Sequence, residues 1–351
     1  MAPVVKALRE NGIQALVLAT AQHRQLLDQM LLAFGIESEW DLNAMKPGQS
    51  LASITGALIP DLERIILESS PQAILAQGDT TTVFCAALSA FYAHIPFGHI
   101  EAGLRSGDLA APFPEEAMRR LTSVITRWHF APTQQARDCL IREGFPANSI
   151  YLTGNTVIDS LLDFSRRDDL PWPPIPPLPE GKRMVLITIH RRENFGLPLK
   201  RILTSIRSFA ESHPDAWFVY PVHPNPNVQQ PAREILGNLR NVCLTSPLDY
   251  PELVHLMKNS FLIFTDSGGI QEEAPALGVP VLIFREVTER PEAVECGSAV
   301  LVGSDPALFF EVAERLWGDL AEYNRMAVPR FPFGTGDSGQ KIAQILLEEI
   351  R

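Results

Sequence analysis

The chain alternates short apolar runs with longer stretches in which apolar residues recur at helical spacing. In the first half, the short runs predict strands at 14–19, 72–76, 97–100, 127–131 and 150–152. The longer stretches predict helices between these strands, for example over 50–68 and 80–92, and a helix at the very start of the chain. Because strands and helices alternate, the pattern indicates a parallel sheet covered by helices.

The same alternation restarts in the second half of the chain. It predicts strands at 184–189, 216–220, 241–244, 261–264 and 279–284. It predicts helices at about 198–212, 251–257, 269–277 and 338–350. We therefore expect an α/β protein of two Rossmann-like domains. Ligands of such sheets bind beyond the carboxyl ends of the strands, so the natural site is a cleft across which the two domains face each other.

A proline-rich segment, DDLPWPPIPPLPEGKR, separates the two halves. Proline lacks a backbone N–H and fixes its own φ, so this segment suits neither a helix nor a central strand. It is typical of a stiff, extended linker. We predict an N-terminal domain over 1–165, a linker over 166–182, a C-terminal domain over 183–332 and a last helical segment over 333–351.

Composition narrows the classes of protein that fit this pattern. A length of 351 residues suits two domains, and a net charge of −11 argues against a nucleic-acid-binding protein. The chain has neither an apolar run long enough to span a membrane nor the basic-then-apolar start of a signal peptide. The scattered cysteines lack metal-binding spacing and predict reduced thiols in a cytoplasmic protein; they are Cys85, Cys139, Cys243 and Cys296.

Three acidic residues of the first half lie at successive strand-to-helix junctions. Asp79 follows a strand and a glycine in ILAQGDTTT, Glu101 directly follows a strand in FGHIEAGLRSGD, and Glu115 begins a helix in PFPEEAMRR. Side chains at these junctions have the placement needed to share one pocket. Clustered carboxylates raise one another's pKa, which suits proton transfer near neutral pH.

Purely structural roles for these acidic residues stay open. Asp79 is a good N-cap residue. Glu101 has Arg105 as a nearby ion-pair partner, and Glu115 shares a helix face with Arg119, four residues later.

Candidate anion-binding groups follow two strands of the second half. His190 and two arginines come directly after the strand at 184–189, although a solvated charge run is the usual explanation of such a cluster. Ser267, Gly268 and Gly269 lie between a strand and a helix, where glycines let the backbone approach a diphosphate and the helix N-terminus supplies N–H donors.

Three charged residues near this turn extend the candidate site. Glu272 and Glu273 lie one helical turn later and suit ribose hydroxyl groups as acceptors, while Arg290 adds positive charge near the same diphosphate.

An ordered set of motifs then points to one family. The chain contains GDTTT, HIEAGLRSGD, PEEAMRR, GNTVID, HRRENFG, DSGGIQEEAPALGVPVL and TERPEA, in this order. Together they closely resemble the bacterial, non-hydrolysing UDP-N-acetylglucosamine 2-epimerases, from Met1 to the last helix. The resemblance implies a glycosyltransferase-B-like fold in which the last helix returns to the N-terminal domain, which carries the catalytic carboxylates, while the C-terminal domain binds UDP.

The resemblance also implies a reaction that needs no cofactor and no metal. UDP-N-acetylglucosamine and UDP-N-acetylmannosamine interconvert: a base removes the C2 proton while the bond from C1 to UDP breaks, which leaves 2-acetamidoglucal and UDP. UDP then adds back as C2 is reprotonated on the opposite face. Which carboxylate is the base in which direction stays open.

Site residues carry over by resemblance. The catalytic set is Asp79, Glu101, Glu115 and His190. The substrate-binding set is Arg119, Ser267, Gly268, Gly269, Glu273 as the ribose ligand, and Arg290. A regulatory site for a second substrate molecule corresponds to Gln22, His23, Gln25 and His223.

The resemblance further implies a homodimer with UDP-N-acetylglucosamine and UDP as ligands, and no nucleic-acid or membrane partner. Relatives begin with a strand and a GTRPEA-type loop, and MAPVVKAL resembles the segment that follows this loop. We therefore expect the first strand, with an arginine and a lysine, to be absent from this sequence. The alternatives are a hydrolysing epimerase or a glycosyltransferase on the same fold, or a UDP-sugar-binding paralogue that is inactive because it lacks this loop.

Overall fold

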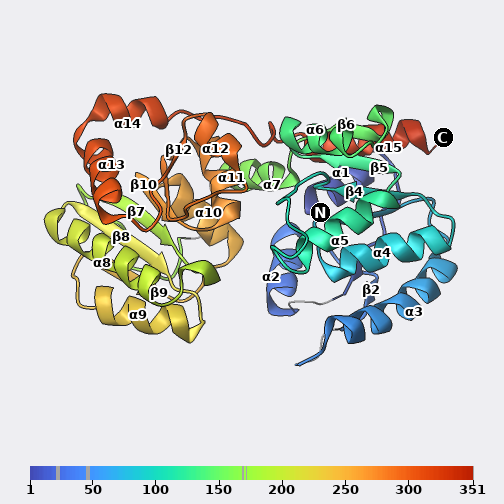
Figure 1. Ribbon diagram of the computed structural model, residues 1–351, viewed down its shortest axis with the longest axis horizontal. Coiled ribbons are helices and arrows are strands. Elements are labelled where there is room, and N and C mark those ends of the chain that lie inside the picture. Colours follow the sequence, from blue (N-terminus) through green and yellow to red (C-terminus); the bar gives the residue numbers. More distant parts are fainter. Residues whose placement is uncertain (21–23, 45–47, 168–169, 171, 351) are drawn as a thin grey trace. The chain divides into compact units, whose positions relative to one another are not determined.

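The computed structural model describes residues 1–20, 24–44, 48–167, 170 and 172–350. The chain divides into two compact units, the first formed by Met1–Ser160 with Phe333–Arg351 and the second by Leu161–Pro332. Each unit combines parallel strands with helices (Figure 1). None of the helices in these described ranges has both the length and the apolar character that crossing a membrane requires.

The first unit contains a four-stranded parallel sheet in the order β3-β4-β5-β6 and a separate parallel pair, β1-β2. The strands are β1 (Leu18–Ala19), β2 (Trp40–Asp41), β3 (Ile74–Gln77), β4 (Phe97–Ile100), β5 (Trp128–Ala131) and β6 (Ile150–Leu152). The helices are α1 (Ala2–Glu10), α2 (Arg24–Phe34), α3 (Leu51–Ser69), α4 (Thr81–Tyr92), α5 (Glu115–Val124), α6 (Gln134–Arg142), the short 3-10 helix η1 (Ala147–Ser149), α7 (Thr156–Ser165), which continues into the second unit, and α15 (Ser338–Glu349).

The strands predicted for the first half are confirmed, two of them with the same bounds, at 97–100 and 150–152, but the strand predicted at 14–19 is limited to Leu18–Ala19. The first helix is also confirmed as α1. The short strand β2 was not predicted. Within the described ranges, β1 pairs with β2 and not with β3, so these strands form two sheets. The absence of a first strand stays a prediction.

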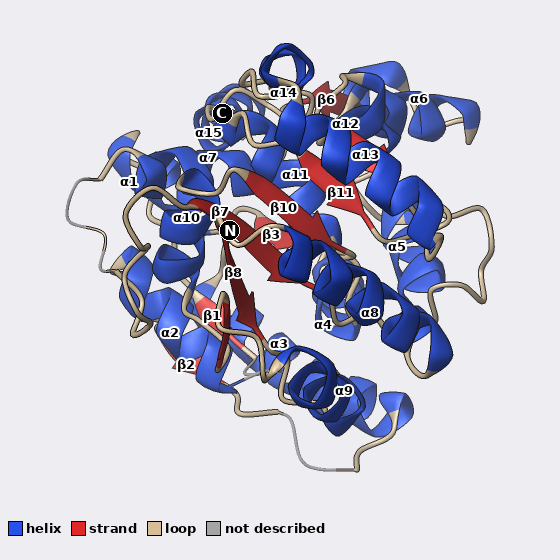
Figure 2. Cartoon of the chain, turned by 90° about the vertical axis from the view of Figure 1, so that its left-hand side faces the viewer, coloured by secondary structure: helices blue, strands red, loops and turns tan. Residues whose placement is uncertain are grey.

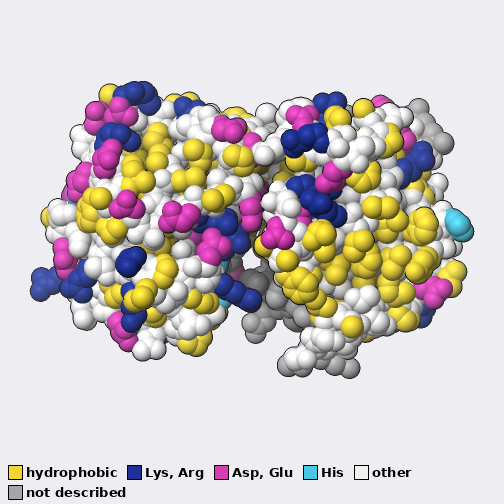
Figure 3. Space-filling view, viewed as in Figure 1, with side chains coloured by type: hydrophobic (Ala, Val, Ile, Leu, Met, Phe, Trp, Pro, Cys, Tyr) yellow, Lys and Arg dark blue, Asp and Glu magenta, His cyan; other side chains and the backbone are white. Residues whose placement is uncertain are grey.

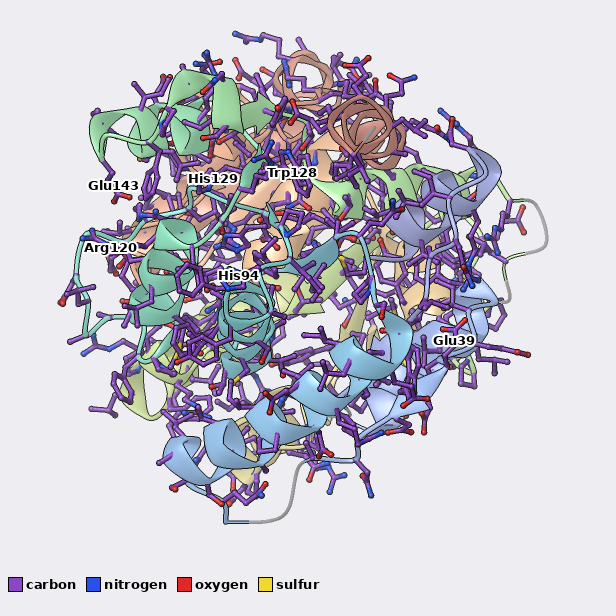
Figure 4. The ribbon with its side chains drawn as sticks, turned by 90° about the vertical axis from the view of Figure 1, so that its right-hand side faces the viewer. Glu39, His94, Arg120, Trp128, His129 and Glu143 are labelled. Atoms are coloured by element: carbon purple, nitrogen blue, oxygen red, sulfur yellow. The ribbon has the colours of Figure 1, made fainter. Side chains whose placement is uncertain are left out.

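Strand β5 shows how alternation builds the core of the first unit. Trp128 and His129, labelled in Figure 4, are successive residues, so their side chains point to opposite faces of the sheet. Trp128 joins an apolar cluster with Val4 of α1 and Ile342 of α15. The C-terminal helix therefore packs against the first helix of the chain, within the first unit.

The second unit contains one six-stranded parallel sheet in the order β12-β11-β10-β7-β8-β9. Its strands are β7 (Arg183–Thr188), β8 (Ala216–Pro221), β9 (Val242–Thr245), β10 (Leu262–Thr265), β11 (Val281–Ile283) and β12 (Ala299–Leu301). Its helices are η2 (Arg192–Asn194), α8 (Leu197–Ser212), α9 (Pro226–Leu236), α10 (Tyr250–Lys258), α11 (Gly268–Leu277), α12 (Pro291–Glu295), α13 (Pro306–Gly318) and α14 (Leu320–Met326). All strands and helices predicted in this half are confirmed, to within a few residues at their ends.

The core of the second unit is aromatic. Phe209 of α8 packs edge-on against Phe218, Phe264 and Phe309, with ring centroids 5.9–6.2 Å apart. Edge-to-face contacts at this separation are favourable beyond the area that they bury. Helices lie on both sides of the sheet (Figure 2), which explains why the middle of β7 and the whole of β10 are buried and mostly apolar.

The proline-rich segment forms neither helix nor strand in its described residues, as predicted. It is not a free linker, however. The Trp172 ring meets the His255 ring edge-on at 5.2 Å, and Ile175 is 8% exposed. Trp172, Ile175 and His255 all belong to the second unit, so this part of the segment is packed within that unit.

Candidate active site

The carboxyl ends of β3 and β4 bring two predicted catalytic residues close together. Gln77 and Ile100 are paired in the sheet, so the residues that follow them are neighbours. The position that a Cβ would take at Gly78 lies 3.9 Å from Glu101 Oε2. Glu101 Oε2 also accepts a hydrogen bond of 3.3 Å from Gln77 Nε2. Asp79 and Glu101 therefore lie at adjacent strand ends, as the sequence predicts.

The backbone at Glu101 is strained. Its φ is +68°, in the left-handed region that non-glycine residues rarely occupy and that costs on the order of 1 kcal/mol. Two residues later, Gly103 has a φ of +91°, and a Cβ there would lie 2.3 Å from the carbonyl oxygen of Ala136. The loop is thus pressed against α6, and this close packing holds Glu101 in its strained conformation. Strain of this kind is concentrated at functional sites.

A buried histidine fixes the turn before Asp79. His99 is fully buried on β4, and its Nε2 lies 2.7 Å from the carbonyl oxygen of Gly78. Burial lowers the pKa of His99 to about 4, so the neutral ring donates its Nε2–H to this carbonyl. His129, its neighbour across the sheet, has its pKa lowered to about 3 by burial as well. The sequence did not single out either histidine as part of a site.

Arg119 joins Asp79 to helix α5. Its Nη2 lies 2.5 Å from Asp79 Oδ2, and its Nη1 lies 3.0 Å from Glu116 Oε2. Glu116 is fully buried and also accepts hydrogen bonds from Arg120 Nε and from the Ser106 backbone N–H. Arg119 thus pairs with Glu116 and Asp79 rather than with Glu115, the partner that helical spacing suggested.

The structural alternative for Glu101 is wrong. Arg105 pairs with Glu143 and not with Glu101: its Nε and Nη2 donate to the two carboxylate oxygens of Glu143 at 2.9 and 2.7 Å. Glu115 is half-buried in the first turn of α5. Among the described residues, the structure gives no hydrogen bond or ion pair that joins Glu115 to Asp79 or Glu101. Two of the three predicted carboxylates are thus brought together, and the third lies on the helix that carries Arg119.

In the second unit, the N-terminus of α11 gathers positive charge. Ser267 is the N-cap residue and Gly268 is the first residue of the helix, so backbone N–H groups of the first turn lack helical acceptors. A Cβ at Gly268 would lie 2.9 Å from Arg290 Cζ and 3.2 Å from Arg191 Nη2. Glycine is therefore needed where two guanidinium groups approach the helix. Helix N–H donors and two arginines together make a site for an anion such as a diphosphate.

The two arginines differ in their partners. Arg290 donates from Nε to Glu272 Oε1 and from Nη1 to Glu289 Oε2, both at 2.8 Å. Within the described ranges, no acidic side chain forms an ion pair with Arg191. Glu272 thus holds Arg290, which differs from the ribose contact that the sequence suggested for it.

Glu273 is almost completely buried, at 4% exposed, and accepts a hydrogen bond of 2.6 Å from the Tyr250 hydroxyl. Burial raises the pKa of Glu273 to about 8, so its carboxyl group is largely protonated at neutral pH. The ribose contact expected for Glu273 stays a prediction. Tyr250, its partner, was not among the predicted site residues.

His190, predicted to be catalytic, lies face to face with His223, predicted to be regulatory. Their rings are stacked 5.6 Å apart with an interplanar angle of 10°. Burial is the largest influence on His190 and lowers its pKa, His223 and Arg191 lower it further, and the carboxylate of Asp266 opposes this shift. The structure therefore places these two histidines at one edge of the second sheet.

The remaining regulatory candidates are not located. Gln22 and His23 lie outside the described residues. Gln25 belongs to helix α2, and its side chain is likewise outside the description.

Sequence reasoning missed Glu116, Tyr250 and Asp266, although one of them carried a readable signal. Asp266 comes directly after a buried strand, as Glu101 does. The pattern that identified Glu101 would therefore have found Asp266. The burial of Glu116 and the contact of Tyr250 with Glu273 depend on neighbours distant in the chain.

Comparison with known proteins agrees with this geometry. A family model described as UDP-N-acetylglucosamine 2-epimerase matches residues 6–347. A UDP-N-acetylglucosamine 2-epimerase of Yersinia pestis is 46% identical over 356 residues, which cover 99% of this chain and 94% of the relative.

Solved structures are similar over the same length. The UDP-GlcNAc 2-epimerase of Neisseria meningitidis bound to UDP-GlcNAc has a TM-score of 0.89 at 44% identity, covering 99% of this chain and 96% of that one. The enzyme of Methanocaldococcus jannaschii in complex with UDP-GlcNAc and UDP has a TM-score of 0.80 at 31% identity, covering 99% and 95%. The predicted α/β fold with parallel sheets, glycosyltransferase-B-like, is confirmed. The chain belongs to the UDP-N-acetylglucosamine 2-epimerase family.

Proposed function

We propose that this chain interconverts UDP-N-acetylglucosamine and UDP-N-acetylmannosamine by eliminating UDP and adding it back through 2-acetamidoglucal. The observation that carries the proposal is the start of α11, where Arg191 and Arg290 both approach Gly268. The C2 proton of the sugar is not acidic, so elimination depends on stabilising the departing diphosphate. Fixed positive groups and N–H donors provide that stabilisation without reorganising during the reaction.

The carboxylates of the first unit serve the proton transfers at C2. Asp79 and Glu101 lie at adjacent strand ends, and Arg119 holds Asp79 through a charge-assisted hydrogen bond. A base on one face of C2 and an acid on the other suffice for inversion at that carbon. Glu115 belongs to the same proposal by its place on α5, one helical turn before Arg119. We leave open which carboxylate acts as the base in each direction.

Glu273 and Tyr250 bind the ribose of UDP in this scheme. A largely protonated carboxyl group and a phenol, joined by a hydrogen bond of 2.6 Å, offer both donors and acceptors to the ribose hydroxyl groups. Glu273 is 4% exposed, and its carboxyl group has acceptor capacity beyond the hydrogen bond from Tyr250, which a ribose hydroxyl group would use.

Exchange of the C2 proton tests the proposal. The protein is incubated with UDP-N-acetylglucosamine in deuterated water, and the sugar and UDP are followed by NMR. The proposal predicts deuterium at C2, formation of the N-acetylmannosamine epimer and no net release of UDP.

The other outcomes identify the alternatives. Net UDP together with free sugar would indicate a hydrolysing epimerase. UDP binding without any deuterium at C2 would indicate a binding protein without a working base, and it would refute the catalytic proposal.

We also propose that the chain forms a homodimer through the first unit. Helix α4 packs against both α3 and α5, and the exposed apolar side chains of these helices gather on the surface shown at the right of Figure 3. The most exposed of them are Leu67, Phe91, Tyr92, Leu121 and Val124. A contiguous apolar patch on a protein surface marks an interaction site more often than isolated residues do, and the family resemblance favours a second copy of this chain as the partner.

A further inference from the structure

A fully buried carboxylate lies under the anion-binding edge of the second unit. Asp266 follows strand β10, directly before the N-cap residue of α11, and its side chain is 0% exposed. An isolated charge in such a place is very unfavourable unless hydrogen bonds stabilise it. The reaction proposed above assigns no role to this residue.

Within the described ranges, the donors to the Asp266 carboxylate all belong to one loop. The His190 backbone N–H lies 2.9 Å from Oδ1 and 3.1 Å from Oδ2, and the Arg191 backbone N–H lies 2.9 Å from Oδ2. The side-chain amide of Asn194 donates to Oδ2 at 2.8 Å. One carboxylate thus receives donors from both ends of the segment between β7 and the end of η2.

Further bonds tie this segment to the neighbouring strands. The Asn194 amide also donates to the carbonyl oxygen of Phe284 at 3.2 Å, just after β11. The Asp266 backbone N–H donates to the carbonyl oxygen of Thr188 on β7 at 3.2 Å. The loop is therefore attached to the ends of β7, β10 and β11, three neighbouring strands of the sheet.

The backbone that Asp266 holds carries Arg191 and His190, the two side chains of this loop placed near the anion site. Arg191 places its Nη2 3.2 Å from the Cβ position of Gly268, and the His190 ring stacks on His223. Asp266 itself is an acceptor-only, negative group, so it repels a diphosphate rather than binding it. Its contribution to an anion site is therefore indirect.

We infer that Asp266 is a positioning residue of the diphosphate site: its carboxylate fixes the backbone of His190 and Arg191, and so directs Arg191 to the N-terminus of α11. The inference deepens the proposed function and rests on its assignment of UDP to this edge. It separates two roles at the site, since the arginines contact the anion and the buried carboxylate holds one of them in place.

The test compares Asp266→Asn with Asp215→Asn. Asparagine keeps the shape of the side chain, but it replaces one acceptor oxygen with an NH2 group that faces N–H donors. Asp215→Asn removes the same charge from the other edge of the sheet, before β8, where Asp215 is half-exposed and binds Arg183. We expect Asp266→Asn to raise the Kd for UDP, measured by calorimetry, about ten-fold or more, as for a lost charge-assisted hydrogen bond. Asp215→Asn should leave this Kd within about two-fold of the original, because it lies far from the site along the strands.

A double-mutant cycle with Arg191→Ala separates positioning from general damage. If Asp266 acts through Arg191, Asp266→Asn adds little to the loss already caused by Arg191→Ala. Full additivity of the two losses would overturn the inference, and so would unchanged UDP binding by folded Asp266→Asn. If Asp266→Asn fails to fold, Asn194→Ala replaces it in the same cycle. Full additivity with Arg191→Ala, or unchanged UDP binding, would again overturn the inference.

The cycle also distinguishes this inference from the proposed function. It measures binding of UDP alone and needs no turnover. A wild-type protein that binds UDP but exchanges no deuterium at C2 would refute the proposed reaction and leave the cycle interpretable. Normal C2 exchange combined with additive losses would refute the positioning role of Asp266 and leave the reaction standing.

Discussion

At the scale of single residues, burial decides how the titratable groups behave. Glu273 and the two strand histidines, His99 and His129, are each held in their neutral forms by desolvation, which raises the pKa of the acid and lowers the pKa of the bases. Raising the pH therefore costs stability at Glu273, whereas lowering the pH costs stability at the two histidines.

The first prediction concerns Glu273. Its folded-state pKa of about 8 exceeds its ordinary value of 4.5, so the folded protein holds a proton that the unfolded chain has lost, and stability falls as pH rises between these values. Glu273→Gln should remove this dependence, worth up to about 3 kcal/mol between pH 5 and 8.

Denaturant unfolding at both pH values checks this prediction. Glu311→Gln, at an exposed acid of α13 in the same unit, is the control and should follow the original protein. A pH dependence that persists in Glu273→Gln would show that the buried carboxyl group is not its source.

The second prediction concerns His129. Its folded-state pKa of about 3 lies below its ordinary value of 6.5, so the unfolded chain takes up a proton that the folded protein does not, and stability is lost as pH falls below about 6.5. His129→Phe keeps an aromatic ring beside Phe145, 5.0 Å away. It should reduce the loss of unfolding free energy between pH 7 and 5 by about 2 kcal/mol.

Urea titrations at the two pH values measure this loss. His94→Gln, at an exposed histidine of the same unit (labelled in Figure 4), should leave the loss unchanged. An equal loss in His129→Phe and the original protein would contradict the assignment.

At the scale of elements, the start of α11 depends on what a strand, a loop and a helix place together. The β10 end supplies the N-cap residue, the β7 loop supplies Arg191, and the segment after β11 supplies Arg290. The two guanidinium groups converge on Gly268 because strands β7, β10 and β11 are adjacent in the sheet.

The third prediction therefore concerns Gly268→Ala. The new Cβ would meet Arg290 Cζ at 2.9 Å, so a flexible guanidinium group must move while the backbone stays in place. We expect little change in stability but an increase of about ten-fold or more in the Kd for UDP, since a charge-assisted contact is displaced.

Calorimetry with UDP measures this effect, and Gly318→Ala is the matched control. Gly318 ends α13 in the same unit, and a Cβ there meets nothing within 4 Å. Equal affinity in the two variants would mean that the anion does not use the guanidinium groups at α11.

At the scale of the whole molecule, the proposed homodimer depends on the exposed apolar side chains of α3, α4 and α5 (Figure 3). These side chains lie near the C-terminal ends of the three helices. In an α/β unit the helices that connect parallel strands point the same way, so their C-terminal ends lie on one side of the unit. The patch is therefore a consequence of topology and not of any one helix.

The fourth prediction is that Val124→Asp converts a dimer into a monomer. Val124 is 72% exposed, so a charge there is tolerated in the monomer but is unfavourable inside an apolar interface. Light scattering after size-exclusion chromatography measures the mass.

Leu320→Glu is the control for this prediction, because Leu320 is 67% exposed on α14 in the other unit. It should leave the mass unchanged. A dimer in both variants would place the interface elsewhere, and a monomeric original protein would refute the homodimer.

The sequence by itself determined most of the predicted strands and helices, although not the short strand β2. The runs at 97–100 and 150–152 became strands with the same bounds, and all residues of the first are buried, as is typical of a parallel strand covered on both faces. The family was also readable, since its motifs lie in a fixed order at the junctions between strands and helices.

Only the tertiary structure decided which charged groups pair. Helical spacing suggested that Arg119 pairs with Glu115, but its partners are Asp79 and Glu116. Proximity in the chain suggested that Arg105 pairs with Glu101, but its partner is Glu143. A buried charge is very unfavourable without a partner nearby, and strand order and helix packing determine which residues lie near it in space. The contact of Tyr250 with Glu273 and the burial of Glu116 could not be predicted for the same reason, because both depend on residues distant in the chain.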